Sequence, residues 1–372
     1  MGLFREIKYI IKYFSAAKSA TDVTFYSEGG IYYQYFKGTI EAIIKKSDIK
    51  ILYITSDIQD PVWKLQGNQF ESFYINKLLP FVFPFINTKT LVLTMADLDL
   101  YHIKRSTNQV NHIYMFHAIN SVHMQYSQGA FDHYDTIFCV GAHHVKEIRK
   151  SEEVYNLPAK ELVEVGYSWL EEIELKYGKS VTRGNKILIA PTWSVGNILE
   201  TCIETIIEKL LPLPYEIIVR PHPEFIKRQG ERIKEIKDKY KSHANLFIET
   251  ESSSSTNILE SNVLITDWSG IAIEYAWGMF KPVIYIDTPK KVHNPDYGKI
   301  DIVPLEDQTR ELNGTVLKTS NCDSINVEIE KALQLNEEKQ ERLLNLRNKH
   351  IFNWGESSNV AADYIINYCN KN

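Results

Sequence analysis

Arg220-Pro221-His222-Pro223 follows directly on an apolar run at residues 215–219, and Thr266-Asp267-Trp268-Ser269-Gly270 follows a second apolar run at residues 263–265. Each run reads as a strand, and the second leads into a helical pattern, so the sequence predicts two strand-to-helix junctions. The first junction carries cations, and the second is rich in small hydroxyl and amide donors. Junctions of this kind hold pyrophosphate at the carboxyl ends of parallel strands.

Strand and helix patterns alternate along the whole chain, which indicates parallel βαβ units. Strands are predicted at residues 23–26, 49–54, 91–94, 113–116, 136–140, 163–165, 186–190, 216–219, 245–248, 263–265 and 283–286. A polar stretch at residues 171–185 separates two halves of similar size. The sequence therefore predicts an α/β protein with two doubly wound sheets, a cleft between them and a domain boundary at residues 180/181, where the last helix can cross back to the first domain.

The composition narrows the class of protein. A chain of 372 residues is about right for two domains, and 44% hydrophobic with 24% charged residues is typical of a globular protein. The formal net charge of −5 argues against a general nucleic-acid binder. The four cysteines form no CxxC pair, so we expect free thiols in a reducing compartment. The sequence shows neither a spanning run of ~18 apolar residues nor a secretory signal, and we expect a cytoplasmic protein.

The first 18 residues form a basic amphipathic pattern. One helical stripe is apolar, and basic residues lie beside it: Leu3, Ile7, Ile10, Ile11 and Phe14 against Arg5, Lys8 and Lys12. Such a helix can lie on an anionic membrane surface, at the inner face of the cell membrane. The other interpretation is a helix that packs on its own domain and leaves its basic face in water.

The residues of the two junctions suit anion binding. The prolines make the first turn rigid, Arg220 can contact a phosphate through two N–H groups, and His222 can donate a hydrogen bond to a leaving phosphate or protonate it. At the second junction Ser269 or Asp267 can cap the helix, and Gly270 lets a ligand approach the backbone. Glu274, on the helix that follows, is a further candidate. The alternatives are a plain turn with a capping histidine and an ordinary helix N-cap.

A candidate base lies in the first half of the chain. His117 stands at the tip of the strand predicted at residues 113–116, and His123 follows shortly after it. A histidine at a strand tip can act as a general base, so the two compete for that role. The structural alternative is a hydrogen-bonded histidine of the core. His143 and His144 are adjacent on a predicted helix and make a poor metal pair, so we expect no metal site.

Several of these motifs together resemble the CDP-glycerol glycerophosphotransferase family, whose members build teichoic-acid-type polymers and related capsule chains. The resemblance spans roughly residues 110–370 and rests on the stretches 131–135, 190–193, 220–223, 265–270, 281–285 and 352–358. It implies a GT-B fold of two Rossmann-like domains with the active site between them: an N-terminal acceptor-binding domain at 1–180 and a C-terminal nucleotide-donor-binding domain at 181–372. It also implies transfer of glycerol phosphate, or another polyol phosphate, from a CDP donor to an acceptor hydroxyl, with CMP leaving.

The resemblance also assigns roles. His117 matches the base of the family, Arg220 and His222 match groups on the donor diphosphate, and Ser269 with the Gly270 backbone matches a phosphate-binding pair of serines. Thr192 lies in the stretch similar to the family's first nucleotide-binding motif. The chain departs from the family at residues 118–120, where a Gly-Thr-Pro sequence is usual, and at Gly270, where the second serine is usual.

Three other readings stay open. The first is a GT-B glycosyltransferase that uses a CMP- or UDP-sugar in capsule or lipopolysaccharide synthesis, and the second is an epimerase on the same fold. The third is a non-catalytic binding subunit of a polymer-assembly complex. The expected partners are a nucleotide-activated donor, a glycan or lipid-linked acceptor and a membrane surface at residues 1–18. Neither a cofactor, a metal nor a nucleic acid is expected.

Overall fold

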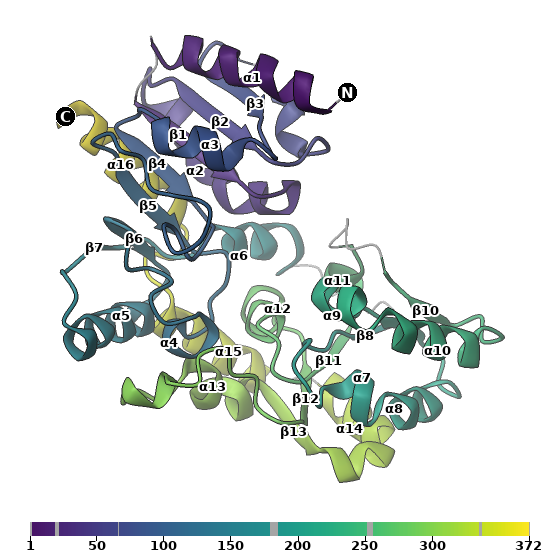
Figure 1. Cartoon of the computed structure of the whole chain (residues 1–372). Coiled ribbons are helices and arrows are strands. Elements are labelled where there is room, and N and C mark those ends of the chain that lie inside the picture. Colours follow the sequence, from purple (N-terminus) through teal and green to yellow (C-terminus); the bar gives the residue numbers. More distant parts are fainter. Residues whose placement is uncertain are drawn as a thin grey trace. The chain divides into compact units, whose positions relative to one another are not determined.

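Apolar runs of three to five residues, mostly buried on both faces, build two all-parallel sheets in this computed structural model (Figure 1). The structure describes residues 2–18, 22–65, 67–178, 185–250, 256–334 and 337–371. The chain divides into two compact units. Unit 1 comprises Met1–Trp169, His293–Ile302 and His350–Asn372, and unit 2 comprises Leu170–Val292 and Val303–Lys349. The predicted boundary at residues 180/181 falls outside the described residues.

Unit 1 has a seven-stranded sheet in the order β3-β2-β1-β4-β5-β6-β7. Its strands are β1 (Val23–Ser27), β2 (Ile51–Thr55), β3 (Phe70–Tyr74), β4 (Thr90–Leu93), β5 (Asn111–Met115), β6 (Thr136–Cys139) and β7 (Glu161–Glu164). Its helices are α1 (Gly2–Ala16), α2 (Tyr33–Lys46), α3 (Leu79–Val82), α4 (Val122–Gln125), α5 (Ala142–Tyr155) and α16 (Ser357–Lys371), with short turns η1 (Gly30–Tyr32), η2 (Pro61–Lys64), η3 (Phe83–Phe85) and η5 (Tyr297–Lys299). The strand order reverses between β1 and β4.

Unit 2 has a six-stranded sheet in the order β10-β9-β8-β11-β12-β13. Its strands are β8 (Lys186–Ile189), β9 (Glu216–Val219), β10 (Leu246–Ile248), β11 (Val263–Thr266), β12 (Val283–Asp287) and β13 (Gly314–Lys318). Its helices are α7 (Ile198–Thr201), α8 (Ile203–Leu210), α9 (Pro223–Arg228), α10 (Gly230–Tyr240), α11 (Thr256–Glu260), α12 (Ile271–Met279), α13 (Leu305–Asn313), α14 (Ile325–Leu333) and α15 (Glu337–His350), with η4 (Glu174–Gly178) and η6 (Thr319–Ser324). The helix α6 (Ser168–Ile173) begins where the two units divide.

Both sheets have the doubly wound strand order, in which ligands bind beyond the carboxyl ends of the strands where that order reverses. In unit 2 this switch point lies between β8 and β11, which pair in parallel with Leu188 opposite Leu264. The prediction of an α/β protein with two Rossmann-like sheets is confirmed. The edge strands β3 and β13 are strands that the sequence pattern did not indicate.

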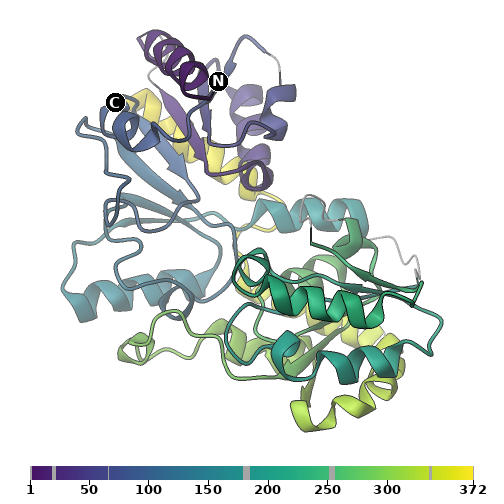
Figure 2. The same cartoon turned by 45° about the vertical axis from the view of Figure 1, so that its right-hand side comes forward.

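The last segment of the chain returns to unit 1 and packs through glycines. A Cβ on Gly141 would lie 1.8 Å from the backbone oxygen of His350, and a Cβ on Gly166 would lie 2.3 Å from that of Phe352. Phe352 also donates its backbone N–H to the oxygen of Val140 at 2.9 Å. This docking brings α16 against α2, so the C-terminal helix completes the core of unit 1 (Figure 2).

The helix α1 packs on unit 1 through a face other than the apolar stripe predicted from the sequence. Its buried residues are Glu6 and Tyr13, and the Glu6 carboxylate accepts hydrogen bonds from the backbone N–H groups of Asn76 and Leu78 at 3.1 and 3.0 Å. Much of the apolar stripe predicted from the sequence faces solvent instead, with Leu3, Ile7 and Ile11 all exposed. Phe4, between them, is 85% exposed. The helix therefore packs on its own unit and still presents an apolar face to the outside.

Candidate active site

Asp267 organises the switch point of unit 2. Its carboxylate is buried and accepts hydrogen bonds from the backbone N–H groups of Thr192 at 2.8 Å, Trp268 at 2.8 Å and Ile198 at 3.3 Å. Burial raises the pKa of Asp267, and these three hydrogen bonds oppose that rise. Because both carboxylate oxygens bind the chain's own N–H groups, Asp267 holds the loop after β8 against the end of β11. Thr192, a predicted phosphate ligand, is thereby fixed at this edge.

Arg220 lies at the carboxyl end of β9, next to β8 in the sheet. Its backbone N–H donates to the oxygen of Ile189 at 2.8 Å, which extends the pairing of the two strands. Its guanidinium is largely buried and contacts Glu249 Oε2 through Nη1 at 3.3 Å. The salt bridge with Glu249 orients a rigid fork of N–H donors at the sheet edge.

His222 caps the helix that follows β9. Its Nδ1 accepts a hydrogen bond from the backbone N–H of Glu224 at 3.1 Å, and Pro223 occupies the first helical position. Because Nδ1 accepts, the neutral ring carries its proton on Nε2. The ring centroid lies 6.2 Å from that of Trp193, which follows β8. His222 can therefore cap the helix through Nδ1, which was one interpretation of the sequence, and also donate a hydrogen bond through Nε2.

The junction after β11 leads into α12. Gly270 is the N-cap residue of α12, and no side chain forms a cap hydrogen bond there. Ser269 is half-buried, and Glu274 lies half-buried in the first turn. The amino end of a helix carries a partial positive charge and favours anions. Arg220, His222, Thr192 and the Ser269-Gly270 pair therefore stand at the carboxyl ends of three neighbouring strands, β9, β8 and β11.

His117 follows β5 in unit 1 and lies among aromatic rings. Its ring centroid is 5.3 Å from that of Tyr32 and 6.0 Å from that of Tyr35. Burial lowers the pKa of His117 to about 4, and a hydrogen bond with the backbone of Thr94 opposes this shift. Its Nδ1 atom is buried and has no hydrogen-bond partner within the described residues. The ring is therefore neutral at pH 7 and has a nitrogen able to accept a proton.

The loop after His117 is held by two histidines that sequence reasoning had set aside. The Nε2 atoms of His143 and His144 on α5 contact the backbone oxygens of Ile119 and Asn120, at 2.7 and 3.0 Å. Burial lowers the pKa of both histidines, so the neutral rings donate to the carbonyls. These contacts position the segment that carries His117.

His123 occupies a different environment from His117. It lies on α4 and is buried, with Nδ1 at 3.1 Å from Glu147 Oε2 and Nε2 at 3.1 Å from the backbone oxygen of Ile302. The same Glu147 oxygen accepts from the backbone N–H of Val122. Since acceptors face both ring nitrogens, His123 ties α4 to α5 and to the segment His293–Ile302.

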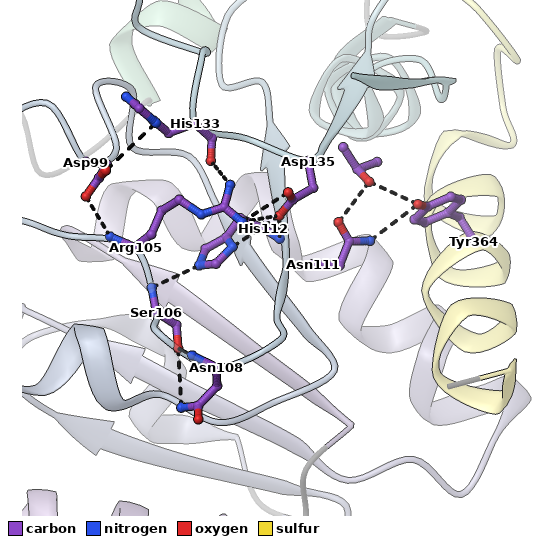
Figure 3. Close-up of polar contacts among 10 residues, drawn as sticks. Asp99, Arg105, Ser106, Asn108, Asn111, His112, His133, Asp135 and Tyr364 are labelled. Carbon is purple, nitrogen blue, oxygen red and sulfur yellow. Dashed lines mark hydrogen bonds and ion pairs between the residues drawn. The ribbon is translucent and has the colours of Figure 1, made fainter. Parts of the chain in front are cut away.

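Asp135, in the stretch at residues 131–135, lies at the edge of the unit 1 sheet opposite to the edge that carries His117 (Figure 3). Asp135 precedes β6 and accepts hydrogen bonds from the backbone N–H of His112 at 2.8 Å and from Arg105 Nη2 at 2.9 Å. Burial alone would raise the pKa of Asp135, but the hydrogen bonds from His112 and Arg105 lower it overall. The buried His112 ring lies 3.2 Å from the same carboxylate. This network fixes the amino ends of β5 and β6, away from His117.

Lys291 is a cation at the unit 2 edge that sequence reasoning missed. It follows β12 in the loop Thr288-Pro289-Lys290-Lys291, and its Nζ lies 6.0 Å from the ring centroid of Trp193. The available signal was a pair of lysines just after a predicted strand.

The described residues contain neither a metal-binding cluster nor a membrane-spanning helix. No group of three or more His, Cys, Asp or Glu side chains is placed to hold a metal ion there. Nor does the described part of the chain contain a helix long and apolar enough to cross a membrane.

Comparison with known proteins adds a family and a fold. The family model of CDP-glycerol:poly(glycerophosphate) glycerophosphotransferases matches residues 88–367. A search of curated protein sequences gave no match. The chain is similar in structure to the wall teichoic acid polymerase TagF, with a TM-score of 0.59 at 14% identity, covering 99% of this chain and 98% of that one.

Two epimerases are similar as well. The UDP-GlcNAc 2-epimerase from Neisseria meningitidis has a TM-score of 0.56 at 11% identity, covering 93% of this chain and 99% of that chain. The corresponding enzyme from Methanocaldococcus jannaschii has a TM-score of 0.55 at 13% identity, covering 94% and 99%. At these identities the likeness establishes the fold, which is GT-B in its two parallel-sheet units.

Proposed function

This chain belongs to the CDP-glycerol:poly(glycerophosphate) glycerophosphotransferase family, and on that premise we propose that it transfers glycerol phosphate, or another polyol phosphate, from a CDP-activated donor to an acceptor hydroxyl in cell-surface polymer synthesis. One observation carries the proposal. Arg220, His222, Thr192 and the amino end of α12 all stand at the carboxyl edge of one sheet, beside the point where its strand order reverses. A diphosphate is the ligand that this set of donors suits.

We assign the donor to unit 2. The Arg220 guanidinium and the Nε2–H of His222 would donate to the diphosphate, and the positive end of α12 beside Ser269 and Gly270 would favour its charge. Asp267 acts through Thr192, whose backbone it fixes. These groups would stabilise the charge that develops on the departing CMP. Charge neutralisation is thus assigned to side chains and a helix end, without a metal or another cofactor.

We assign the base to His117. Its neutral ring would take the proton of the acceptor hydroxyl while the hydroxyl oxygen attacks the β-phosphorus of the donor. The bond between that phosphorus and the bridging oxygen would break, and CMP would leave with the electron pair. The contrast with His123 supports this choice. Neither Nδ1 atom has a hydrogen-bond partner within the described residues, but that of His123 lies 3.1 Å from the Glu147 carboxylate, and the Nε2 of His123 lies 3.1 Å from the backbone oxygen of Ile302.

We also propose that the protein works at the cytoplasmic face of the cell membrane, on a lipid-linked or glycan acceptor. The exposed residues Leu3, Phe4, Ile7 and Ile11 form an apolar face on α1, and basic residues lie on the same helix. A helix of this kind binds the interface of an anionic bilayer without spanning it. Teichoic-acid-type or capsule chains are the polymers that fit such an acceptor.

A thermal-shift panel tests the donor. The full chain would be titrated with CDP-glycerol, CDP-ribitol, UDP-sugars and CMP-sugars, and stabilisation by the CDP-polyols alone is the expected result. Stabilisation only by a UDP- or CMP-sugar would instead favour a glycosyltransferase or epimerase. Release of CMP from the preferred donor in the presence of an acceptor would exclude a non-catalytic binding subunit.

A further inference from the structure

The loops after β8 and β12 meet over the end of β11. A Cβ on Gly196 would lie 3.1 Å from Cγ of Pro289, so these two loops are in close contact. On the other side, the indole Nε1 of Trp268 donates to the backbone oxygen of Thr288 at 2.9 Å. Residues 288–291 are therefore held at the edge that carries Thr192 and the start of α12.

Two threonine hydroxyl groups at this edge are buried without a hydrogen-bond partner among the described residues. The side chains of Thr192 and Thr288 belong to residues that are 1% and 4% exposed, and neither Oγ1 atom has a hydrogen-bond partner within the described residues. Thr192 cannot turn away freely, because Asp267 holds its backbone N–H. A buried hydroxyl without a partner is unfavourable, so both positions suit a ligand that supplies an acceptor oxygen.

A positively charged residue, Lys291, follows Thr288 in the same loop. The Nζ of Lys291 lies 6.0 Å from the Trp193 ring, and the charges that act on it most are those of Asp267 and Glu306. Burial lowers the pKa of Lys291, while both carboxylates oppose the shift. An ammonium group placed among hydroxyl donors is a common phosphate ligand in proteins. The neighbouring Lys290 is ion-paired with Asp307 and serves as the control.

We propose that Lys291, Thr192 and Thr288 form a subsite for a phosphate of the donor's diphosphate. The subsite rests on the proposed function, which it deepens by adding to Arg220 and the neutral His222 a second cation that no motif marks. The two hydroxyls donate to phosphate oxygens, and Lys291 neutralises their charge.

Calorimetric titration of the full chain with CDP-glycerol, CDP and cytidine tests the subsite. Lys291→Met weakens the binding of CDP-glycerol and CDP about 10- to 100-fold and leaves cytidine binding unchanged, because only the phosphate contact is lost. Lys290→Met binds all three ligands as the wild type does. Lys291→Gln is the second variant, should the methionine variant fail to fold.

The threonines give a signature that a structural role would not produce. Thr192→Val and Thr288→Val each weaken CDP binding about 3- to 10-fold and keep or raise the Tm, because each removes an unpaired buried hydroxyl. Equal CDP affinity in Lys291→Met and wild type, or an equal loss for cytidine, overturns the subsite while the proposed function stands. If the wild type binds another nucleotide instead of CDP-glycerol, the proposed donor is wrong, and the same variants test the subsite with that nucleotide.

Discussion

His222 Nδ1 accepts a hydrogen bond from the backbone N–H of Glu224 at 3.1 Å, so one imidazole both caps α9 and directs its Nε2–H away from the helix. Two substitutions separate these roles. Asparagine is a good N-cap, so His222→Asn keeps the stability of the fold, whereas His222→Ala loses about 1 kcal/mol of unfolding free energy. Both variants lose the imidazole Nε2–H, since the asparagine amide ends one atom short of it, and we expect turnover to fall about 100-fold or more in each. Urea denaturation and a CMP-release assay measure the two effects.

The account of His222 would fail if His222→Asn turned over CDP-glycerol at the wild-type rate. A loss of stability in both variants alike would contradict the separation of the two roles, because asparagine would then not replace the imidazole as the cap of α9.

The lowered pKa of His117 predicts how kcat/KM and stability depend on pH. Because burial lowers that pKa to about 4, the base stays neutral and kcat/KM stays flat from neutral pH down to about pH 5, then falls at about pH 4. The unfolded chain protonates the same histidine near pH 6.5, so it binds more protons than the folded chain between about pH 4 and 6.5. The contribution of His117 to stability is therefore full above pH 6.5 and decreases on acidification through this window.

His117→Ala should abolish turnover and leave donor affinity unchanged, since we assign the donor to unit 2. Its unfolding free energy should also depend less on pH between about 4 and 6.5 than that of the wild type. A pH-rate profile with its acid limb near 6.5, or near-normal turnover in the variant, would contradict this role. His123→Gln serves as the comparison, because His123 is tied to Glu147 and the backbone of Ile302.

The returning C-terminal segment depends on Gly141 and Gly166. A methyl group on Gly141 would collide with the backbone oxygen of His350, and Gly166 adopts a positive φ of 103° besides lying against Phe352. Gly141→Ala and Gly166→Ala should each destabilise the protein by about 1–3 kcal/mol, measured by urea denaturation. Gly298→Ala is the control, since a Cβ there meets no atom within 4 Å. Wild-type stability in both variants would mean that the segment docks differently.

The exposed apolar face of α1 predicts membrane binding. The full chain should sediment with vesicles that contain anionic lipid, and high salt should weaken that binding because basic residues contribute to it. Phe4→Glu and Ile11→Glu should abolish the binding, since both side chains are exposed on this face. Leu175→Glu replaces an exposed leucine of unit 2 and should have no effect. Equal sedimentation of all the variants would rule out α1 as the binding face.

Much of the fold was predictable because buried parallel strands are nearly continuous apolar runs. The strands of both sheet centres were predicted from such runs, for example β11 from residues 263–265. The edge strands β3 and β13 were not, because only part of each is buried and their residues are mixed in polarity. Helix α1 shows a related limit: its apolar stripe was read correctly, but the residues that it buries are Glu6 and Tyr13.

The candidate site was predictable where a residue directly follows a strand, as Arg220, His222, Ser269 and His117 do. Contacts between distant segments were not. His123 differs from His117 through its contacts with Glu147 and with the backbone oxygen of Ile302, and Ile302 is distant in the sequence. Lys291 approaches Trp193 because the loops after β8 and β12 touch, and no periodicity in the sequence encodes that contact.

The affinity of the full chain for CDP-glycerol, measured by calorimetry in wild type and in Arg220→Gln, tests the central claim most directly. The account predicts one bound CDP-glycerol per wild-type chain and an affinity about 10- to 100-fold lower in the variant, because the guanidinium contacts the diphosphate. Arg342→Gln replaces an exposed arginine of unit 2 on α15; it is the matched control and should bind as the wild type does. Absence of CDP-glycerol binding to the wild type, or equal affinity in the wild type and Arg220→Gln, would contradict the claim that Arg220 holds the donor diphosphate.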